Sequence, residues 1–304
     1  MTKPIVVVIG ATGAQGGSVA NALLKTGGYN VRAITRNPNS EQAKLLASQG
    51  AEVVKGDVSS LDDMKRCFAR AYAVFAVTNT FDPSNQKAGE ELRQGKNMAD
   101  AALASGVQHF IWSTSMNSEQ ISGGKFKVEE FDDKHQVEEY IKEIGLPATF
   151  ADVTFYYENI AKDMLFQILK KEGDTVSISY PIEADIKVPM LAVSVDLGKA
   201  VVAILSNKEK FLGKTLLLTG KSYTLNEYAE IATKVTGIKH VYRFVPPRSI
   251  PPESLVNPIV FEFFNWLFAQ QPQPEVDEST KELGIEWMEL EDYLRSIDYG
   301  KDFE

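Results

Sequence analysis

The sequence has little cysteine, no long apolar run and no excess of positive charge. Its 304 residues contain one cysteine, Cys67, so an intrachain disulfide is excluded and a reducing compartment is expected. No apolar run reaches the roughly 20 residues of a membrane-spanning helix, and the first predicted strand begins so early that we expect no signal peptide. The formal net charge of -9 opposes direct binding to nucleic acid, which depends on many cationic contacts to phosphates. We therefore expect a cytosolic protein without a nucleic-acid or membrane partner, and nuclear access stays open.

A glycine-rich turn follows the first predicted strand, residues 5–9. Gly10, Gly13 and Gly16 come at three-residue intervals before a predicted helix. A strand that ends in glycine and opens a helix leaves backbone N–H groups and the positive end of the helix dipole free for an anion. Gly10 permits a tight turn, Gly13 lets phosphates approach the backbone, and Gly16 lets the helix pack on the strand. The pattern predicts a binding site for the pyrophosphate of a dinucleotide.

No acidic residue ends the second predicted strand, residues 30–35. An acid at this place would accept a hydrogen bond from the ribose 2′-OH of NAD, whereas an arginine can pair with the 2′-phosphate of NADP. Arg36 occupies the place, so the sequence predicts NADP(H), with Ser40 and Lys44 as further candidate contacts. A solvated surface arginine is the alternative interpretation.

Strand and helix patterns alternate along the first half of the chain. Such alternation predicts an α/β fold with a Rossmann-type, doubly wound parallel sheet. After about residue 155 the pattern becomes irregular, which predicts a smaller α+β lobe. We therefore expect an NADP-binding Rossmann domain at 1–154 and a substrate-side or partner-side lobe at 155–304, interleaved with the first. Further strands are expected at 52–55, 72–77, 109–113 and 148–152, with helices from about residue 61 and at 86–105 and 132–144.

Polar residues follow the predicted strands, where a doubly wound sheet binds its ligand. Asp57 would accept a hydrogen bond from the adenine amine and Val58 would pack on the ring, with an acidic helix cap as the alternative for Asp57. Thr78, Asn79 and Thr80 would lie beside the nicotinamide ribose and the pyrophosphate.

The usual acid of a short-chain carbonyl reductase is missing. Such enzymes use a tyrosine as the acid and a lysine four residues later, which lowers the pKa of the tyrosine and holds the ribose. Lys134 has Glu130 at the tyrosine position, and no tyrosine occurs in 126–134. Ordinary Ser-Tyr-Lys chemistry is therefore disfavoured. Lys134 stays a candidate ribose contact, with a solvated helix lysine as the alternative.

Several motifs together resemble the NmrA-like family, which has an atypical short-chain dehydrogenase/reductase fold. The resemblance covers most of the chain, and it implies an NADP-binding protein from a family known chiefly for regulators. These include a fungal nitrogen-metabolite repressor that binds a transcription factor, and a human redox sensor. The motifs lie at 10–19, 35–38, 56–57, 131–134, 138–140, 156–159 and 193–198.

The resemblance also implies a set of cofactor contacts. Tyr156 and Asn159 would border the nicotinamide, and Arg93 would meet a phosphate. The full set is Gly10, Ala11, Thr12, Gly13, Ala14, Gln15, Gly16, Arg36, Asn37, Ser40, Asp57, Val58, Thr78, Asn79, Thr80, Arg93, Lys134, Tyr156, Tyr157, Glu158 and Asn159.

Two functions from different classes follow. The favoured one is an NADP(H)-binding regulator or redox sensor that controls a protein partner, such as a transcription factor or a signalling protein. The alternative is an atypical NADPH-dependent reductase of a quinone, an enone or a phenylpropanoid-like substrate. In the alternative Lys134 would handle the proton and Ser115 or Ser113 would bind the substrate carbonyl. No metal site is expected.

An apolar stretch at 259–268 is rich in aromatic residues. It could line a substrate cleft, form a partner groove or close the core of the second lobe. The core is the favoured interpretation, because aromatic residues at helical spacing usually pack inward.

Overall fold

The computed structural model describes residues 2–82, 85, 87–162, 168–250, 257–270 and 278–301. Within these ranges, no helix combines the length and the apolar character needed to cross a bilayer.

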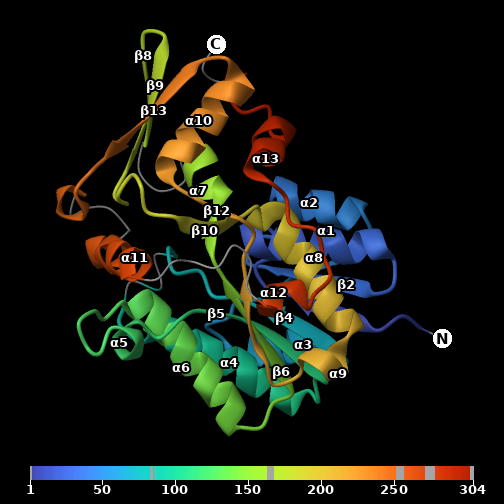
Figure 1. Cartoon of the computed structure of the whole chain (residues 1–304). Coiled ribbons are helices and arrows are strands. Elements are labelled where there is room, and N and C mark those ends of the chain that lie inside the picture. Colours follow the sequence, from blue (N-terminus) through green and yellow to red (C-terminus); the bar gives the residue numbers. More distant parts are fainter. Residues whose placement is uncertain are drawn as a thin grey trace.

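The larger part of the molecule is built on a seven-stranded sheet with the order β11-β6-β5-β4-β1-β2-β3 (Figure 1). All neighbouring strands in it are parallel. The chain fills one edge from β1 to β3 and then returns to the other side of β1 with β4, so the predicted doubly wound Rossmann-type sheet is confirmed. The strands are β1 Ile5–Val8, β2 Asn30–Thr35, β3 Glu52–Lys55, β4 Ala73–Ala76, β5 His109–Thr114, β6 Ala148–Val153 and β11 Thr215–Leu218.

Helices cover both faces of this sheet. The valines of β1 show why its sequence is apolar throughout: Val6 and Val8 pack toward α1 and α8, whereas Val7 packs toward α3 and α4. The helices of this part are α1 Ala14–Thr26, α2 Glu41–Ser48, α3 Leu61–Phe68, α4 Glu90–Ala104, α5 Ser118–Ile121, α6 Glu129–Glu143, α8 Val193–Ser206 and α9 Lys208–Phe211.

Two helix starts differ from the predictions. Helix α4 begins at Glu90, because Gly89 has a φ of 73°, outside the range of a right-handed helix; the predicted start near residue 86 lies outside the described residues. Helix α6 begins at Glu129 rather than at 132.

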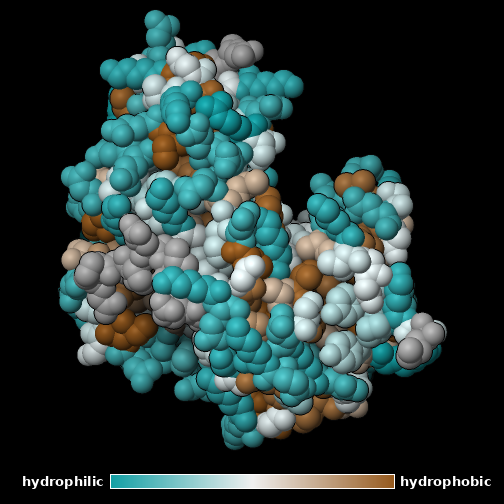
Figure 2. All heavy atoms as spheres, turned by 45° about the vertical axis from the view of Figure 1, so that its right-hand side comes forward, coloured by the Kyte–Doolittle hydropathy of each residue, from teal (hydrophilic) through white to brown (hydrophobic). Residues whose placement is uncertain are grey.

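The second lobe carries two small sheets and stands at the top of Figure 1. Their strand orders are β12-β10-β7 and β13-β9-β8. In Figure 2 the surface is indented between two parts of the molecule, with apolar residues on the floor of the indentation. The elements of the lobe are β7 Phe155–Tyr156, α7 Tyr157–Ala161, β8 Leu169–Glu172, β9 Thr175–Tyr180, β10 Val188–Leu191, β12 Ser222–Tyr223, α10 Leu225–Thr236, β13 Lys239–Phe244, η2 Pro247–Ser249, α11 Pro258–Gln270 and α13 Leu290–Ser296. Helix α12 Glu278–Lys281 lies against β11 of the large sheet instead, where the Thr280 hydroxyl donates to the Leu217 carbonyl.

Residues after 155 also contribute to the first part of the molecule. Strand β11 pairs with β6, and α8 packs on α1. This helix contact is close, because the Gly198 N–H donates to Ser18 Oγ at 2.9 Å and a Cβ at Gly198 would lie 2.3 Å from the Ser18 carbonyl oxygen. The boundary between residues 154 and 155 stays a prediction.

Candidate functional site

The glycine turn between β1 and α1 has the strand-turn-helix form expected from the sequence. Gly10 has a φ of 62°, which favours glycine, and its carbonyl accepts a hydrogen bond from the Gly13 N–H at 2.9 Å. A Cβ at Gly16 would lie 2.3 Å from the Gly10 carbonyl oxygen, so only glycine lets α1 approach β1 this closely.

The N-terminus of α1 is suited to an anion. Its N-cap, Gly13, offers no side-chain hydrogen bond, and its first turn contains no acidic residue. The first N–H groups of a helix have no acceptor within the helix, and here no side chain caps them. The residues therefore fit a dinucleotide pyrophosphate, and the contact itself stays a prediction.

A cavity of about 1640 Å³ opens at the carboxyl ends of the central strands, above this turn. Ordinary ligand pockets have about 300–1,000 Å³, so this one has room for a dinucleotide and a second molecule. It brings together most of the predicted site residues: Gly10, Thr12, Gly13, Ala14, Gln15, Gly16, Arg36, Asn37, Ser40, Asp57, Val58, Thr78, Asn79, Thr80, Ser113, Ser115, Lys134, Tyr156 and Asn159.

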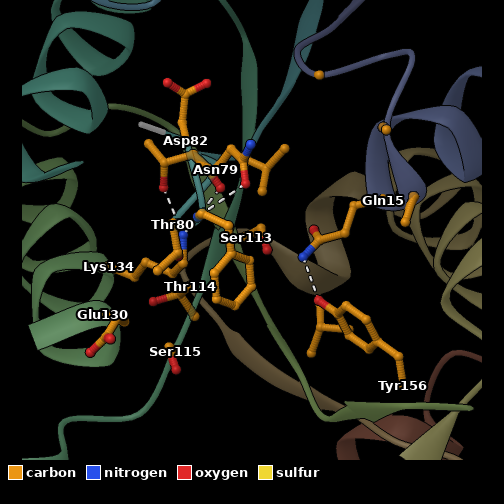
Figure 3. A pocket seen from close by; sticks show the side chains of 18 of the residues that line it. Gln15, Asn79, Thr80, Asp82, Ser113, Thr114, Ser115, Glu130, Lys134 and Tyr156 are labelled. Atoms are coloured by element: carbon orange, nitrogen blue, oxygen red, sulfur yellow. Dashed lines mark hydrogen bonds between the residues drawn. The ribbon is translucent and has the colours of Figure 1, made fainter. Parts of the chain in front are cut away.

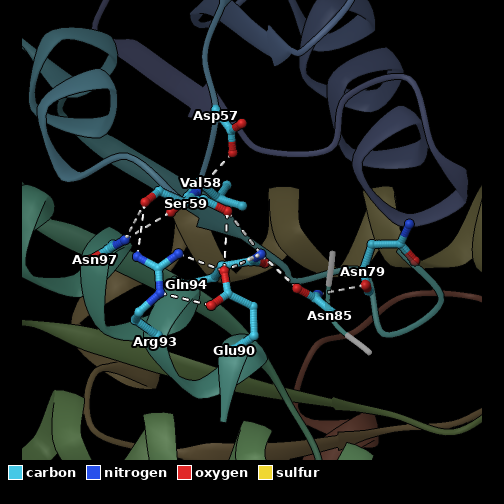
Figure 4. Close-up of polar contacts among 9 residues, drawn as sticks. All are labelled: Asp57, Val58, Ser59, Asn79, Asn85, Glu90, Arg93, Gln94 and Asn97. Atoms are coloured by element: carbon cyan, nitrogen blue, oxygen red, sulfur yellow. Dashed lines mark hydrogen bonds and ion pairs between the residues drawn. The ribbon is translucent and has the colours of Figure 1, made fainter. Parts of the chain in front are cut away.

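Arg93 does not line the cavity. Its guanidinium donates to both carboxylate oxygens of Glu90, at 2.6 and 2.9 Å, and to the Ser59 carbonyl at 3.0 Å (Figure 4). Because Glu90 lies three residues earlier on the same helix, this local contact holds the arginine away from the cavity. Arg93 therefore joins the start of α4 to the loop after β3.

Four other predicted contacts also lie outside the cavity. Lys44 is an exposed residue of α2 that pairs with Glu41, and the other three are buried. Ala11 is buried in the core beside the sheet, and Tyr157 is buried in the core of the second lobe. The Glu158 carboxylate accepts hydrogen bonds from the Val193 and Ser194 N–H groups, at 3.2 and 2.8 Å, so it caps the N-terminus of α8. These three side chains hold the fold around the site.

Asp57 lines the cavity and also shapes the turn before α3. Its carboxylate accepts a hydrogen bond from the Ser59 N–H at 2.9 Å. The N-cap of α3 is Ser60, which accepts from the Asp63 N–H, so the alternative interpretation of Asp57 as the helix cap is wrong.

Lys134 forms a mostly buried ion pair with Glu91 of α4. Its ammonium also donates to Thr78, at 2.7 Å to Oγ1 and 3.3 Å to the carbonyl oxygen, while Thr78 Oγ1 donates to Glu91 at 2.5 Å. The side chains of Lys134 and Glu91 are only 13% and 6% exposed. Thr80 Oγ1 donates to Glu91 as well, at 3.1 Å. The lysine is therefore fixed beside the loop after β4, with its charge neutralised by a residue that the sequence interpretation missed.

Glu130 occupies the place of the missing tyrosine. Burial raises the pKa of its carboxyl, and the nearby carboxylates of Glu91, Glu129 and Asp133 raise it further. One of its oxygens, Oε2, is buried without a hydrogen-bond partner in the described part of the chain. Figure 3 shows it on α6, on the side of the cavity where Ser115 also lies.

Asp152 is a second acid that the sequence interpretation missed. It lies at the carboxyl end of β6, in register with Thr114 of β5, and lines the cavity. Burial, together with the charge of Glu138, raises the pKa of its carboxyl to about 7. At neutral pH a substantial fraction of this carboxyl carries a proton, so it can act as an acid. The sequence could have identified Asp152 as a candidate site residue, because it is an acid at the end of a predicted strand, where a doubly wound sheet binds its ligand.

Tyr156 reaches across the cavity to the glycine turn. The Gln15 side-chain amide donates to its hydroxyl at 2.6 Å (Figure 3). Burial raises the pKa of Tyr156 to about 12 and keeps the phenol neutral. The amide oxygen of Gln15 is buried and has no partner among the described residues, so it remains available to a ligand group that donates a hydrogen bond.

Arg36 forms an ion pair with Asp82, with 2.5 Å between the guanidinium nitrogen and the carboxylate oxygen. Both residues line the cavity, Arg36 from the loop after β2 and Asp82 from the loop after β4.

The far end of the cavity is apolar, and helix α11 forms much of its wall. Phe264 and Phe268 of this helix stack with ring centroids 5.3 Å apart, and both face the cavity. Phe263 packs instead on Phe126, with ring centroids 5.8 Å apart. The helix thus lines the cleft with one side and closes a core with another. The apolar wall, here called the aromatic end, consists of Met116, Ile121, Phe131, Phe155, Tyr180, Val260, Phe261, Phe264, Leu267 and Phe268.

Among the described residues, no group of His, Cys, Asp and Glu side chains is arranged to hold a metal ion.

Comparisons with known proteins agree with this architecture. The NmrA-like oxidoreductase FrzB of Cladobotryum sp. is 32% identical over 257 residues, which cover 80% of this chain and 76% of FrzB. An NmrA-like protein of Dictyostelium discoideum is 33% identical over 249 residues, 80% of each chain.

Solved structures share the fold. The negative transcriptional regulator NmrA in complex with NADP has a TM-score of 0.82 at 22% identity, over 99% of this chain and 98% of NmrA. An NADPH-dependent quinone oxidoreductase of Escherichia coli complexed with NADPH has a TM-score of 0.73 at 20% identity, over 97% of this chain and 99% of that one. The model of the NmrA-like family matches residues 2–294. The chain therefore belongs to the NmrA-like family.

Proposed function

We propose that this protein binds NADP(H) along the cavity and reduces an apolar, conjugated acceptor such as a quinone or an enone. The observation that carries the proposal is the continuity of one cavity from the glycine turn to the aromatic end. A nucleotide would occupy the polar half of the cavity. The apolar half is suited to a second molecule that is itself apolar. The names of the FrzB relative and of the Escherichia coli neighbour point the same way.

The polar half offers a place for each part of the cofactor. The N-terminus of α1 would hold the pyrophosphate, and Arg36 would hold the 2′-phosphate. Asp57 and Val58 would contact the adenine. Thr78 and the Lys134 side chain, both fixed by Glu91, would border the nicotinamide ribose.

The aromatic end would hold the acceptor and exclude water. When bound, NADPH supplies a hydride. The acceptor oxygen would receive a hydrogen bond from Ser115 or Ser113 and a proton from the Asp152 carboxyl, which water in the cavity would restore. Asp152 suits this role better than Lys134, because the lysine already pairs with Glu91.

A regulator is the second candidate, and the arrangement around Lys134 favours it. Glu130 stands where carbonyl reductases have the tyrosine that donates the proton, and the Lys134 ammonium is held in an ion pair with Glu91, so the usual proton donor is missing. The NADP-bound NmrA neighbour is a negative transcriptional regulator. In this role the protein would bind NADP(H) without turnover and present a cofactor-dependent surface to a transcription factor or a signalling protein, in the cytosol or the nucleus.

NADPH oxidation by the purified protein, with a panel of quinones and enones, tests the proposal. We expect turnover that Phe264→Ala strongly reduces and that Phe244→Ala leaves unchanged. Phe244 is a matched control because it is an exposed phenylalanine on β13 that does not line the cavity. NADPH binding without turnover across the panel would reject the reductase and leave the regulator.

A further inference from the structure

We propose that Asp82 sets the cofactor preference by competing with the 2′-phosphate of NADP(H) for Arg36. The inference rests on the proposed binding of NADP(H) and adds a specificity residue from a different loop. It starts from the ion pair of 2.5 Å between the two side chains.

The ion pair spans the nucleotide half of the cavity. Strands β2 and β4 flank β1 on its two sides, and Arg36 and Asp82 extend from the loops that follow these two strands. Their contact therefore passes over the carboxyl end of β1, where the glycine turn begins. A nucleotide whose pyrophosphate lies at that turn brings its adenosine next to this pair.

Asp82 is the fixed member of the pair. Its backbone N–H donates to the Asn79 carbonyl at 3.0 Å, and its own carbonyl accepts from the Asn85 N–H at 2.8 Å. The Asn85 side chain donates to the same Asn79 carbonyl at 2.8 Å and accepts from Gln94 of α4 at 2.6 Å (Figure 4). The loop is thus tied to a helix, and the Asp82 side chain is only 9% exposed.

Arg36 is the movable member, since its side chain is 61% exposed. An ion pair of such an exposed arginine contributes little to stability, so a better partner can replace Asp82. A 2′-phosphate is such a partner, because it carries more charge and accepts two parallel hydrogen bonds from a guanidinium.

As a consequence, the binding of NADP(H) carries an unfavourable free-energy contribution that the binding of NAD(H) does not. When Arg36 turns to the 2′-phosphate, the Asp82 carboxylate stays close to a second anion, and adjacent like charges repel. NAD(H) has no 2′-phosphate and leaves the pair intact. Asp82 therefore weakens NADP(H) binding selectively, and its loss of Arg36 distinguishes the NADP(H)-bound protein from the NAD(H)-bound one.

Calorimetric titration with NADPH and NADH tests this. We expect Asp82→Asn to bind NADPH about tenfold more tightly, equivalent to about 1.4 kcal/mol, and NADH with unchanged affinity. The fragments 2′,5′-ADP and 5′-AMP, which have no nicotinamide, should show the same contrast. Asp82→Glu keeps the negative charge and should retain the wild-type ratio of NADPH affinity to NADH affinity. If Asp82→Asn does not fold, Asp82→Ser removes the same charge.

Glu172→Gln is the matched control. Glu172 is an exposed acid on β8 that pairs with Lys170 and does not line the cavity. Its neutralisation changes the net charge equally and should leave both affinities unchanged. Weaker or unchanged NADPH binding by Asp82→Asn would overturn the inference, because Asp82 would then orient Arg36 or have no effect. A wild-type protein that binds neither nucleotide would instead overturn the proposed function.

Discussion

Lys134 and Glu91 form an ion pair that joins α6 to α4 beneath the loop after β4. Thr78 connects to both charges, accepting a hydrogen bond from Lys134 and donating one to Glu91. A buried charge without its partner is costly, so each member of the pair requires the other. The pair therefore holds the loop that carries Thr78 and Thr80 against the cavity.

Removing one member of this pair should destabilise the fold. We expect Glu91→Gln to lower the free energy of unfolding by about 3–5 kcal/mol, because Lys134 would be left buried and uncompensated. Urea denaturation measures the change. Glu41→Gln removes an acid from a pair in which both side chains are at least 60% exposed, and it should cost at most about 1 kcal/mol. Similar losses in both variants would mean that burial does not matter for the Lys134 pair.

Arg36→Glu should weaken NADPH binding far more than NADH binding. The substitution reverses the charge that would meet the 2′-phosphate and also places two acids together at Asp82. We expect at least a hundredfold loss for NADPH, about 2.7 kcal/mol, and a small loss for NADH, measured by calorimetry. Equal losses for the two nucleotides would show that Arg36 does not contact the 2′-phosphate.

Gly13→Val should abolish binding of both nucleotides while the sheet stays folded. Gly13 has a φ of −96°, which valine tolerates, but its Cβ would stand 3.3 Å from the Gly10 carbonyl oxygen, on the surface where phosphates would approach. Gly28→Val is the control, because a Cβ there meets no atom within 4 Å. Circular dichroism would verify folding. Undiminished affinity in Gly13→Val would contradict the assignment of the turn to the pyrophosphate.

The sheet and the glycine turn could be predicted because their signals are local. Strand residues, glycine spacing and the alternation of elements depend on short stretches of chain and on steric rules. The capping box at the start of α10 is another local feature, because Thr224 and Glu227, which exchange its two hydrogen bonds, are only three residues apart. Interaction partners across the fold could not be predicted. Glu91 and Lys134 are 43 residues apart in the sequence, and only the packing of α4 against α6 brings them together.

Residue roles that the resemblance to the NmrA-like family implied could be wrong for a different reason. The resemblance transferred Arg93 by position, but Glu90, three residues away, binds its guanidinium in this chain. For Asp152 the position could be predicted from the sequence, as an acid at the end of a strand, but the raised pKa of its carboxyl could not. Its pKa depends on burial beside β5 and β11, which the sequence does not reveal.

The raised pKa of Asp152 predicts a specific dependence on pH. Its carboxyl is protonated in the folded protein up to about pH 7, whereas in the unfolded chain it ionises near its ordinary value of about 3.9. The folded state therefore binds the proton more strongly, so this residue stabilises the fold fully below about pH 4 and loses that contribution progressively until about pH 7. If Asp152 is the acid of the reaction, turnover falls at higher pH, because its carboxyl in the folded protein ionises around and above about pH 7.

Asp152→Asn should remove both effects. Urea denaturation at a series of pH values from 4 to 8 should show a smaller decline in the free energy of unfolding than in the wild type, and any turnover should be low and independent of pH near 7. NADPH affinity should change little, because the carboxyl is assigned to the acceptor. Asp174→Asn, which neutralises an exposed acid in the turn between β8 and β9, should keep the wild-type profile. A decline in Asp152→Asn identical to that of the wild type would place the titrating group elsewhere.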